Sequence, residues 1–474
     1  MVDPWLGKGG WYLISRYHSL YACTMKKLLL SLLLFPSILF ANDSLTIRKM
    51  ADHILLNGSA YENLRFLCKQ IGPRLSGSKN ASRAIEATAD MLKKAGADTV
   101  YLQPCMVPKW ERGKKESGWV KVNGIKRKLA LTALGNSEGT GPGGIYGNVI
   151  MVSSLDELHS KKELVNGKIV FIDIRMNQTR ARTFSSYGEA SGGRVRGASI
   201  AARYGAKAAL VRSLTTAIDN LPHTGVVIYN DSFPKIPAVA ISTLDADYLS
   251  GKLRKGMNME AFIQTDCRNM GETLSYNVIG EIKGTHYPDQ ILTVGGHLDS
   301  WDLAEGAHDD GAGCVQSIQV IETIKALGIK PKRTIRAVMF MNEENGGKGA
   351  QAYLKHAKDR HEKHLFAMES DAGGFSPRGF SLDMPTGQME KVLKWKHLFD
   401  DYLVYDFYPG GGGADIGPLK SIGTALVGLS PDSQRYFDLH HAPNDVFEAV
   451  SKRELEFGAI NMTALIWLVS EYGL

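Results

Sequence analysis

The stretch TVGGHLDSWDLAEGAHDDGAGC, residues 293–314, gathers two histidines and five carboxylates among glycines. It begins as an apolar run that is typical of a buried strand, and it leads into residues 311–327, where apolar side chains recur at helical spacing. The chain therefore concentrates like charge where a strand ends and a helix begins. Carboxylates a few ångströms apart raise one another's pKa unless a cation lies among them. The stretch thus predicts a metal site within an α/β fold.

Three apolar runs in the C-terminal half end directly in polar motifs: TVGG in HLDS, VMFM in NEENGG, and LFAMES in DAGG. In open α/β sheets ligands bind outside the carboxyl ends of the strands, so these motifs and the later DLHHAPND are expected to converge. Each motif alone is commonplace, since HDDGAG suits a helix N-cap and NEEN a solvated turn. Together they favour a site for zinc or a similar borderline ion, which histidines combined with carboxylates suit.

The chain is expected to contain two domains. Its 474 residues are long for a single core. Residues 118–268 consist of short apolar runs separated by turns, with one helical stretch near residues 197–204, which predicts a mostly β insert. Residues 42–117 and 269–474, where strand runs alternate with helical patterns, are expected to form the α/β domain around it.

Within the predicted insert, GTGPGG at residues 139–144 matches the spacing of a dinucleotide-binding fingerprint. That fingerprint needs a helix to begin inside it. Pro142 and the strand-like residues that follow predict a loop instead. We therefore expect no dinucleotide cofactor here.

The beginning of the chain indicates export. Residues 25–41 combine two lysines, an apolar run and the small Ala41 before NDS, which is the layout of a secretory signal cleaved near Ala41. Residues 1–24 add nothing that a signal needs, and we interpret 1–41 as a leader with an over-extended start. The mature chain is expected to be secreted or periplasmic. No stable membrane insertion is predicted, because nothing after residue 41 approaches the roughly 20 apolar residues that span a bilayer.

Charge and cysteine content narrow the classes further. The formal net charge of +7 is spread along the chain, which argues against a nucleic-acid surface. No CxxC pair is present, so a structural zinc finger is not expected. Outside the cytoplasm, Cys105 and Cys267, which flank the predicted insert, either form a disulfide or remain isolated buried thiols.

The ordered set GGHLDSWDLAEGAHDDGAG, MNEENGGKGA, ESDAGG and DLHHAPNDV resembles the di-zinc exopeptidases of peptidase family M28, in particular their carboxypeptidase Q-like branch. The resemblance extends over nearly all of the mature chain and includes GPRLSGS, GGGADIGPL and SQRYFDLHH. It implies an αβα sandwich with a central mixed sheet, and it identifies the insert as a protease-associated (PA) domain. It also implies two Zn²⁺ ions per chain, small peptide substrates and a homodimer.

The resemblance assigns roles to particular residues. It implies five metal ligands, which are His297 and Asp371 for one zinc, Glu344 and His441 for the other, and Asp309 as the bridge. Asp299 is implied to orient the imidazole of His297 through its carboxylate, and Glu343 to be the general base. The peptide bond between Asp309 and Asp310 is expected to be cis.

Three further assignments come from the same comparison of motifs. His441 is preferred to His440 as the ligand, because it precedes the x-x-x-Asp tail of the family, which HAPND supplies with Ala where Thr is common. His440 stands where some relatives carry a tyrosine that steadies the tetrahedral intermediate. Asp415 is implied either to meet the amino group of the substrate or to pack the glycine-rich loop.

The implied reaction is hydrolysis of a peptide bond beside a free terminus, of the dipeptidase or aminopeptidase type. One alternative is a single-zinc glutaminyl cyclase-like enzyme. Another is a catalytically silent protein that binds partners through its PA domain and holds structural metals. Structural zinc sites favour cysteine and histidine ligands, whereas this set is rich in carboxylates with Glu343 as a spare, which argues against the silent protein.

Overall fold

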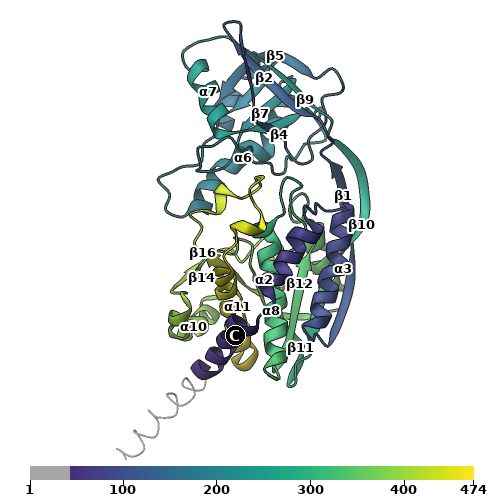
Figure 1. The fold of residues 1–474 in the computed structure, drawn as a ribbon, viewed down its shortest axis with the longest axis vertical. Helices are drawn as coiled ribbons and strands as arrows, with labels where there is room; N and C mark the ends of the chain where they lie inside the picture. Colours follow the sequence, from purple (N-terminus) through teal and green to yellow (C-terminus); the bar gives the residue numbers. More distant parts are fainter. Residues whose placement is uncertain (1–42) are drawn as a thin grey trace, which may run out of the picture.

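The computed structural model describes residues 43–474, which form two β-sheets joined by a long two-stranded ribbon (Figure 1). The ribbon consists of β1 (Thr99–Glu111) and β10 (Arg268–Ile282), which pair antiparallel along most of their length. The predicted leader, residues 1–41, lies outside the described residues. Among residues 43–474, no helix is long and apolar enough to span a membrane.

The first sheet has eight strands in the order β1-β10-β12-β11-β13-β16-β14-β15. The remaining strands of this sheet are β11 (Tyr287–His297), β12 (Arg333–Phe340), β13 (Lys363–Glu369), β14 (Pro377–Asp383), β15 (Asp406–Pro409) and β16 (Ala425–Pro431). Strands β12, β11, β13 and β16 are parallel neighbours, whereas β10 and β14 pair with them antiparallel. Toward their carboxyl ends β11, β12 and β13 are buried and mostly apolar, because both of their faces are covered there.

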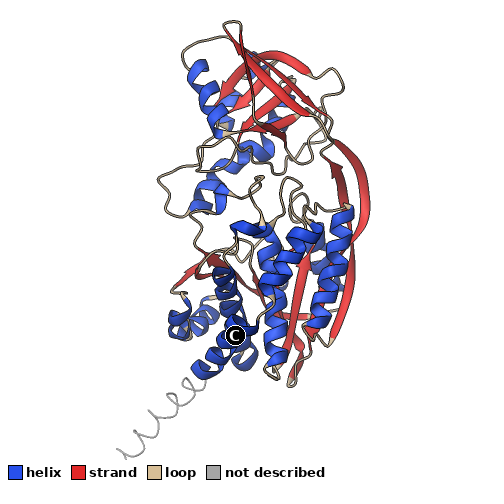
Figure 2. Ribbon diagram, in the orientation of Figure 1, coloured by secondary structure: helices blue, strands red, loops and turns tan. Residues whose placement is uncertain are grey.

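Helices cover this sheet on both faces (Figure 2). They are a helix over residues 43–57, α2 (Ala60–Phe66), α3 (Lys79–Lys94), α8 (Ala312–Ala326), α9 (Lys348–Asp359), α10 (Thr386–Lys394) and α11 (Lys452–Tyr472). α3, α8 and α11 pack on one face over the larger apolar core, while α9 packs on the other face over a smaller core. The result is the αβα sandwich with a mixed sheet that the motifs implied.

The second sheet is built by residues 116–265, which we call the insert. Its strands run in the order β3-β2-β9-β5-β6-β7-β8-β4. They are β2 (Glu116–Val122), β3 (Ile125–Lys128), β4 (Leu131–Ala133), β5 (Ile145–Val152), β6 (Ile169–Ile172), β7 (Ala208–Arg212), β8 (Ala238–Ile241) and β9 (Met259–Thr265). The helices of the insert are α4 (Leu155–Ser160), α5 (Lys162–Val165), α6 (Thr183–Arg203) and α7 (Thr243–Leu253). GTGPGG lies in the loop between β4 and β5, as its proline indicated.

The insert contains more helix than a mostly β prediction allows. The 21-residue α6 was expected only near its C-terminal end, because four glycines interrupt its helical pattern. Two of these glycines, Gly193 and Gly197, let the helix lie close to the sheet: a Cβ atom on Gly197 would stand 2.4 Å from Cδ1 of Ile172 in β6. Residues 225–230, one of the short apolar runs on which the mostly β prediction rested, form only an isolated bridge between Val226 and Gly135.

The cysteines are buried thiols. Cys68, Cys105, Cys267 and Cys314 are all free and buried, so the alternative of a disulfide between Cys105 and Cys267 is not realised. The pairing of β1 with β10 explains why Cys105 and Cys267 lie apart. Cys105 is opposite Ser275, whereas Cys267 immediately precedes Arg268, which is opposite Glu111. Six residues of strand correspond to about 20 Å, far beyond the roughly 7 Å that a disulfide spans between Cα atoms.

Candidate active site

The polar motifs meet at one edge of the first sheet. β11 ends at His297, Glu343 and Glu344 follow the end of β12, and Asp371 follows the end of β13. Because β12, β11 and β13 are parallel neighbours, their carboxyl ends bring these side chains together. The convergence that the sequence predicted is therefore present.

Asp309 lies at the centre of the cluster. Its Oδ1 is 3.2 Å from Nε2 of His297, which in turn is 3.4 Å from Oδ1 of Asp371. Its Oδ2 is 3.3 Å from Nε2 of His441, which is 3.1 Å from Oε2 of Glu344. Two histidine–carboxylate pairs thus flank one shared carboxylate.

This donor set fits two cations. Oδ2 of Asp309 is buried without a hydrogen-bond partner among the described residues. Like-charged oxygens from three carboxylates also face one another across the cluster, an arrangement that a cation on each side neutralises. Imidazole nitrogens combined with carboxylate oxygens are the donors of zinc and similar ions.

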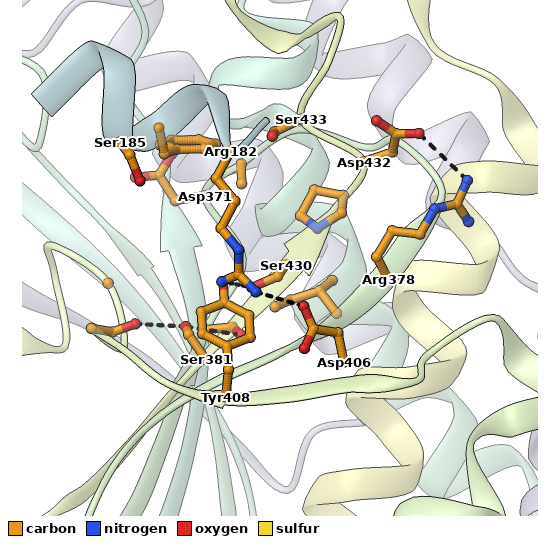
Figure 3. A pocket seen from close by; sticks show the side chains of 18 of the residues that line it. Arg182, Ser185, Asp371, Arg378, Ser381, Asp406, Tyr408, Ser430, Asp432 and Ser433 are labelled. Atoms are coloured by element: carbon orange, nitrogen blue, oxygen red, sulfur yellow. Dashed lines mark hydrogen bonds and ion pairs between the residues drawn. The ribbon is translucent and has the colours of Figure 1, made fainter. Parts of the chain in front are cut away.

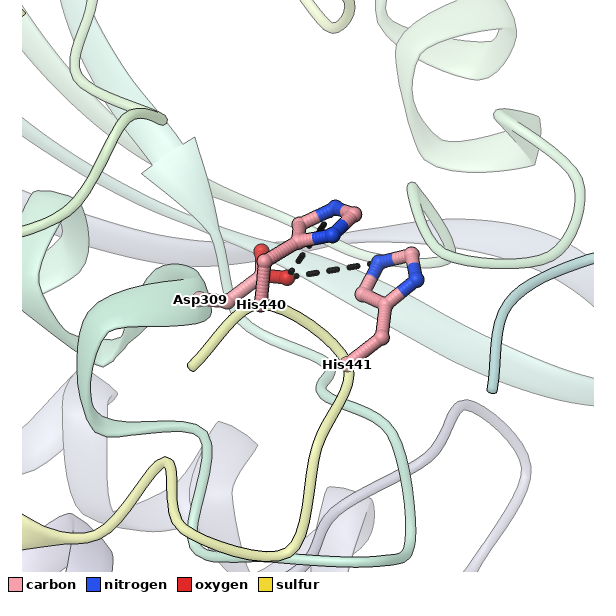
Figure 4. A group of neighbouring side chains, drawn as sticks. All are labelled: Asp309, His440 and His441. Atoms are coloured by element: carbon pink, nitrogen blue, oxygen red, sulfur yellow. Dashed lines mark ion pairs between the residues drawn. The ribbon is translucent and has the colours of Figure 1, made fainter. Parts of the chain in front are cut away.

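His440 and His441 stack on each other beside Asp309 (Figure 4), with ring centroids 3.5 Å apart. Nε2 of His440 is 3.8 Å from Oδ2 of Asp309, farther than the 3.3 Å of His441. Burial lowers the pKa of His440 to about 3, so it is neutral at pH 7. The distances favour His441 as the donor to a cation shared with Glu344.

Backbone amides hold Asp309 in place. The carboxylate of Asp445, the last residue of HAPND, accepts hydrogen bonds from two successive amides, including that of Asp309 at 3.1 Å. Asp310 turns away from the cluster, and its carboxylate accepts from the amides of His297 and Gly313. Asp310 thereby caps α8, while Asp309 faces the site. The peptide bond between Asp309 and Asp310 is cis, which confirms the expectation from the resemblance.

Arg74 is a structural residue of the site that the motifs of the sequence did not identify. Its guanidinium is fully buried and donates to the carbonyl oxygens of Leu298, Glu305 and Gly306 at 2.6 to 2.9 Å. It therefore fixes the loop between β11 and Asp309. The signal was the arginine within GPRLSGS, which the sequence indicated only as a turn.

Asp299 acts differently from the expectation. Nδ1 of His297 lies 2.8 Å from the main-chain oxygen of Asp299, whereas its distance to the carboxylate is 3.9 Å. The carboxylate instead accepts from the amides of Asn342 at 2.6 Å and Glu343 at 3.1 Å. The main-chain carbonyl thus orients the imidazole, and the side chain fixes the turn that carries Glu343.

The electrostatics of the cluster follow from burial. Withdrawal from water, together with the nearby carboxylates of Asp371 and Asp309, raises the pKa of Glu343 to about 8 against the effect of His297. Burial also raises the pKa of Glu344 and Asp371. Asp309 differs: burial alone would raise its pKa, but its hydrogen bond with His297 lowers it below the usual value.

These shifts predict how the metal-free protein responds to pH. Burial raises the pKa of Glu343 and Glu369 to about 8 and that of Asp445 to about 7. The native state then holds protons that the unfolded chain releases above about pH 4, so stability falls as pH rises through the folded values. In excess chelator we expect the melting temperature to fall by about 5 °C or more between about pH 6 and 8.5. Differential scanning fluorimetry tests this. The zinc-loaded protein is the control and should change less, and a melting temperature that rises under chelator would contradict the expectation.

Asp415 is buried near the cluster, 2% exposed and with neither carboxylate oxygen partnered among the described residues. Burial and then Glu369 and Glu343 raise its pKa well above the usual value. Glu369 instead accepts from the amides of Ala414 and Ile416, so the glycine-rich loop wraps around it. The carboxylate that holds the glycine-rich loop is therefore that of Glu369 and not that of Asp415.

A cavity of about 680 Å³ opens beside the cluster (Figure 3). Asp371 is part of its wall, and the start of α6 closes one side. Arg182 of the insert pairs with Asp406 at 2.8 Å, and its guanidinium lies 4.0 Å from the ring centroid of Tyr408. Arg378 lines the same space, at 3.5 Å from Asp432. The cavity thus borders both the cluster and the insert.

The insert also holds the histidine pair directly. The amide of Thr224 donates to the carbonyl of His441 at 2.9 Å, and the carbonyl of Thr224 lies 3.3 Å from Nδ1 of the same residue. His223 contacts the carbonyl of His440 at 2.8 Å through Nδ1. In Figure 1 the chain after β16 runs between the two sheets, which makes these contacts possible. A segment of the insert therefore orients His441, as the carbonyl of Asp299 orients His297.

An αβα sandwich with this donor set at its strand ends defines a metallopeptidase-like protein. The model of peptidase family M28 matches residues 277–466. Carboxypeptidase Q of Homo sapiens is 35% identical over 416 residues, which cover 87% of this chain and 84% of that protein. The crystal structure of a peptidase M28 precursor from Shewanella amazonensis SB2B matches with a TM-score of 0.87 and 31% identity, over 91% of this chain and 97% of that one. A zinc aminopeptidase from Bacillus subtilis shares the fold, with a TM-score of 0.63 and 21% identity over 88% of this chain and 95% of that one. The chain belongs to peptidase family M28.

Proposed function

We propose that this protein is a secreted di-zinc exopeptidase that hydrolyses small peptides beside a free terminus. The observation that carries the proposal is the placement of Asp309 between two histidine–carboxylate pairs, with Glu343 next to them and bound to neither. Carboxypeptidase Q and the B. subtilis zinc aminopeptidase are named for such activities, which supports the reaction class.

The proposed ligands divide into two sets around the shared carboxylate. His297 and Asp371 would hold one ion, Glu344 and His441 would hold the other, and Asp309 would contribute to both. Two Zn²⁺ ions bound there would lower the pKa of water and polarise the scissile carbonyl group. The geometry leaves the Glu343 carboxylate free for proton transfer.

Glu343 is the proposed general base. It takes a proton from the attacking water as the carbon–oxygen bond forms, and delivers it to the leaving amine as the peptide bond breaks. Asp299 holds the turn that carries Glu343 through two amide hydrogen bonds, which fixes the distance of the base from the reacting atoms. Asp299 is therefore a positioning residue for Glu343 as well as for His297.

The cavity beside the cluster suits a short peptide. Its volume of about 680 Å³ lies within the range of small-molecule sites. Asp415, buried and unpartnered two residues beyond Gly413 of the cavity wall, is the proposed contact for the amino group of the substrate. The insert, residues 116–265, is the proposed PA domain, and the predicted signal in residues 25–41 supports secretion. A homodimer stays a prediction of the family resemblance.

A panel of three substrates under two conditions tests the proposal. We expect two zinc ions per chain and hydrolysis of an unblocked dipeptide that chelator abolishes and added zinc restores. The N-acetylated dipeptide and an aminoacyl anilide show which terminus must be free. Mass spectrometry of the products and metal analysis are the measurements.

The same panel separates the alternatives. One zinc per chain with cyclisation of an N-terminal glutamine would support the glutaminyl cyclase-like enzyme. Bound metal without turnover of any substrate would support the silent binding protein. Either result would contradict the proposed function.

A further inference from the structure

Helix α6 of the insert carries two side chains that contact the histidine pair, Tyr187 and Arg194. They are seven residues apart, about two helical turns, and so lie on the same face. Nη2 of Arg194 donates to the hydroxyl of Tyr187 at 2.7 Å, and Nη1 lies 3.3 Å from Nδ1 of His441. The insert thereby places a cation and a phenol beside the proposed ligands.

Arg194 is only partly satisfied by its contacts, unlike Arg74, which also lacks an ion pair within the described residues but donates to three carbonyl oxygens. Arg194 is 5% exposed, its Nε has no partner, and no carboxylate among residues 43–474 forms an ion pair with it. Arg212 is similarly buried in the insert, but it pairs with Asp173 at 2.6 Å. A buried guanidinium without a counter-ion is costly. We therefore expect Arg194 to stabilise a negative charge that is absent from the resting protein.

The chain makes room for this guanidinium. Gly225 has φ +130°, and a Cβ atom there would lie 2.4 Å from Cζ of Arg194. Gly225 follows Thr224, whose carbonyl lies 3.3 Å from Nδ1 of His441. The same segment of the insert thus orients the histidine and admits the arginine.

Tyr187 is held rigidly over the histidine pair. Its ring stacks on Phe437 at 4.9 Å between centroids and meets the edge of His440 at 5.1 Å. Because an arginine only donates, the hydroxyl of Tyr187 accepts from Arg194 and keeps its own proton for another acceptor. Burial raises the pKa of Tyr187, and the charges of Asp309 and Glu343 raise it further although Arg194 opposes them. The phenol therefore stays protonated and lies within the field of the cluster.

We infer that Tyr187 donates a hydrogen bond to the oxyanion of the tetrahedral intermediate and that Arg194 orients and polarises this donor. The inference rests on the proposed function and adds the insert to its catalytic machinery. His440 occupies the position where some relatives carry a tyrosine, and a neutral imidazole stacked on His441 supplies no phenol there. Tyr187 supplies it from another part of the chain. In a site poor in water one such donor contributes about 10²- to 10³-fold to turnover.

The test is Tyr187→Phe in the full-length zinc-loaded protein, because phenylalanine keeps the packing on Phe437 and His440. We expect kcat to fall about 100-fold, with KM within about threefold and two zinc ions retained. Affinity for a phosphinic dipeptide, which mimics the tetrahedral intermediate, should fall in parallel with kcat. Affinity for a product amino acid should not change. Arg194→Met should cause a smaller fall in kcat in the same direction.

Two further tyrosines make the result decisive. Tyr204→Phe removes a hydroxyl bonded to His159 at the C-terminal end of the same helix and should behave as the unmodified protein. Tyr436, buried near the same carboxylates, is the rival donor. If Tyr187→Phe keeps more than a third of kcat, or Tyr436→Phe alone shows the loss, the inference is wrong while the proposed function stands. If the unmodified protein cleaves no peptide, both are wrong.

Discussion

Glu343→Gln is expected to leave a folded protein with two zinc ions and almost no turnover. Glutamine keeps the size of the side chain but cannot accept the proton of the attacking water, and a general base contributes about 10²- to 10⁴-fold. The amide of Glu343 still donates to Asp299, so the turn should keep its place. Steady-state kinetics on an unblocked dipeptide, together with metal analysis, measure both effects.

Two other glutamates serve as comparisons for this variant. Glu344→Gln should lose zinc as well as turnover, because Glu344 faces His441 at 3.1 Å and is a proposed ligand. Glu362→Gln removes the same charge at the opposite end of β13, where it pairs with Arg336, and should keep turnover. Retention of more than a tenth of normal activity by Glu343→Gln would assign the base to another residue.

The strands that carry the cluster could be predicted because their sequence and environment agree. β11, β12 and β13 are buried on both faces toward their carboxyl ends, so each closes with a mostly apolar run that leads into a polar motif. Parallel pairing then places all three ends at one edge. His297, Glu344 and Asp371 therefore converge for reasons visible in the chain itself.

The direction of individual side chains could not be predicted in the same way. Asp299 follows β11 at the spacing expected of a partner for His297, yet the carboxylate turns to the amides of Asn342 and Glu343. Which of its oxygens meets the imidazole depends on the backbone of the loop, and that backbone is fixed by Arg74 more than 200 positions away in sequence. Motif spacing contains no information about such a contact.

The amino-acid composition of α6 prevented the sequence from revealing the part of the insert that meets the cluster. Four glycines in α6 weaken its helical pattern, although two of them, Gly193 and Gly197, are what lets the helix approach β6 closely. Tyr187 and Arg194 belong to no motif, and they precede His441 by about 250 positions. Only the folding of the insert over the sheet brings them to the histidine pair.

His297→Ala is expected to remove zinc and stability together. His297 is fully buried, and its loss leaves Asp309 and Asp371 facing each other without the imidazole that separates them. A cation that binds only the folded chain stabilises it by about 2.7 kcal/mol when its concentration is 100 times its dissociation constant, and the variant forfeits this. We expect one zinc ion or fewer per chain, no turnover, and a melting temperature at least about 5 °C lower that no longer responds to chelator. Metal analysis and thermal melts with and without chelator measure this.

His364→Ala is the matched control, since His364 is also buried but lies at the start of β13 beside Glu362. It should lower the melting temperature while keeping two zinc ions and turnover, because its imidazole is at the far end of the strand from the cluster. If His297→Ala still bound two zinc ions, the half of the site formed with Asp371 would have to be assigned to other residues.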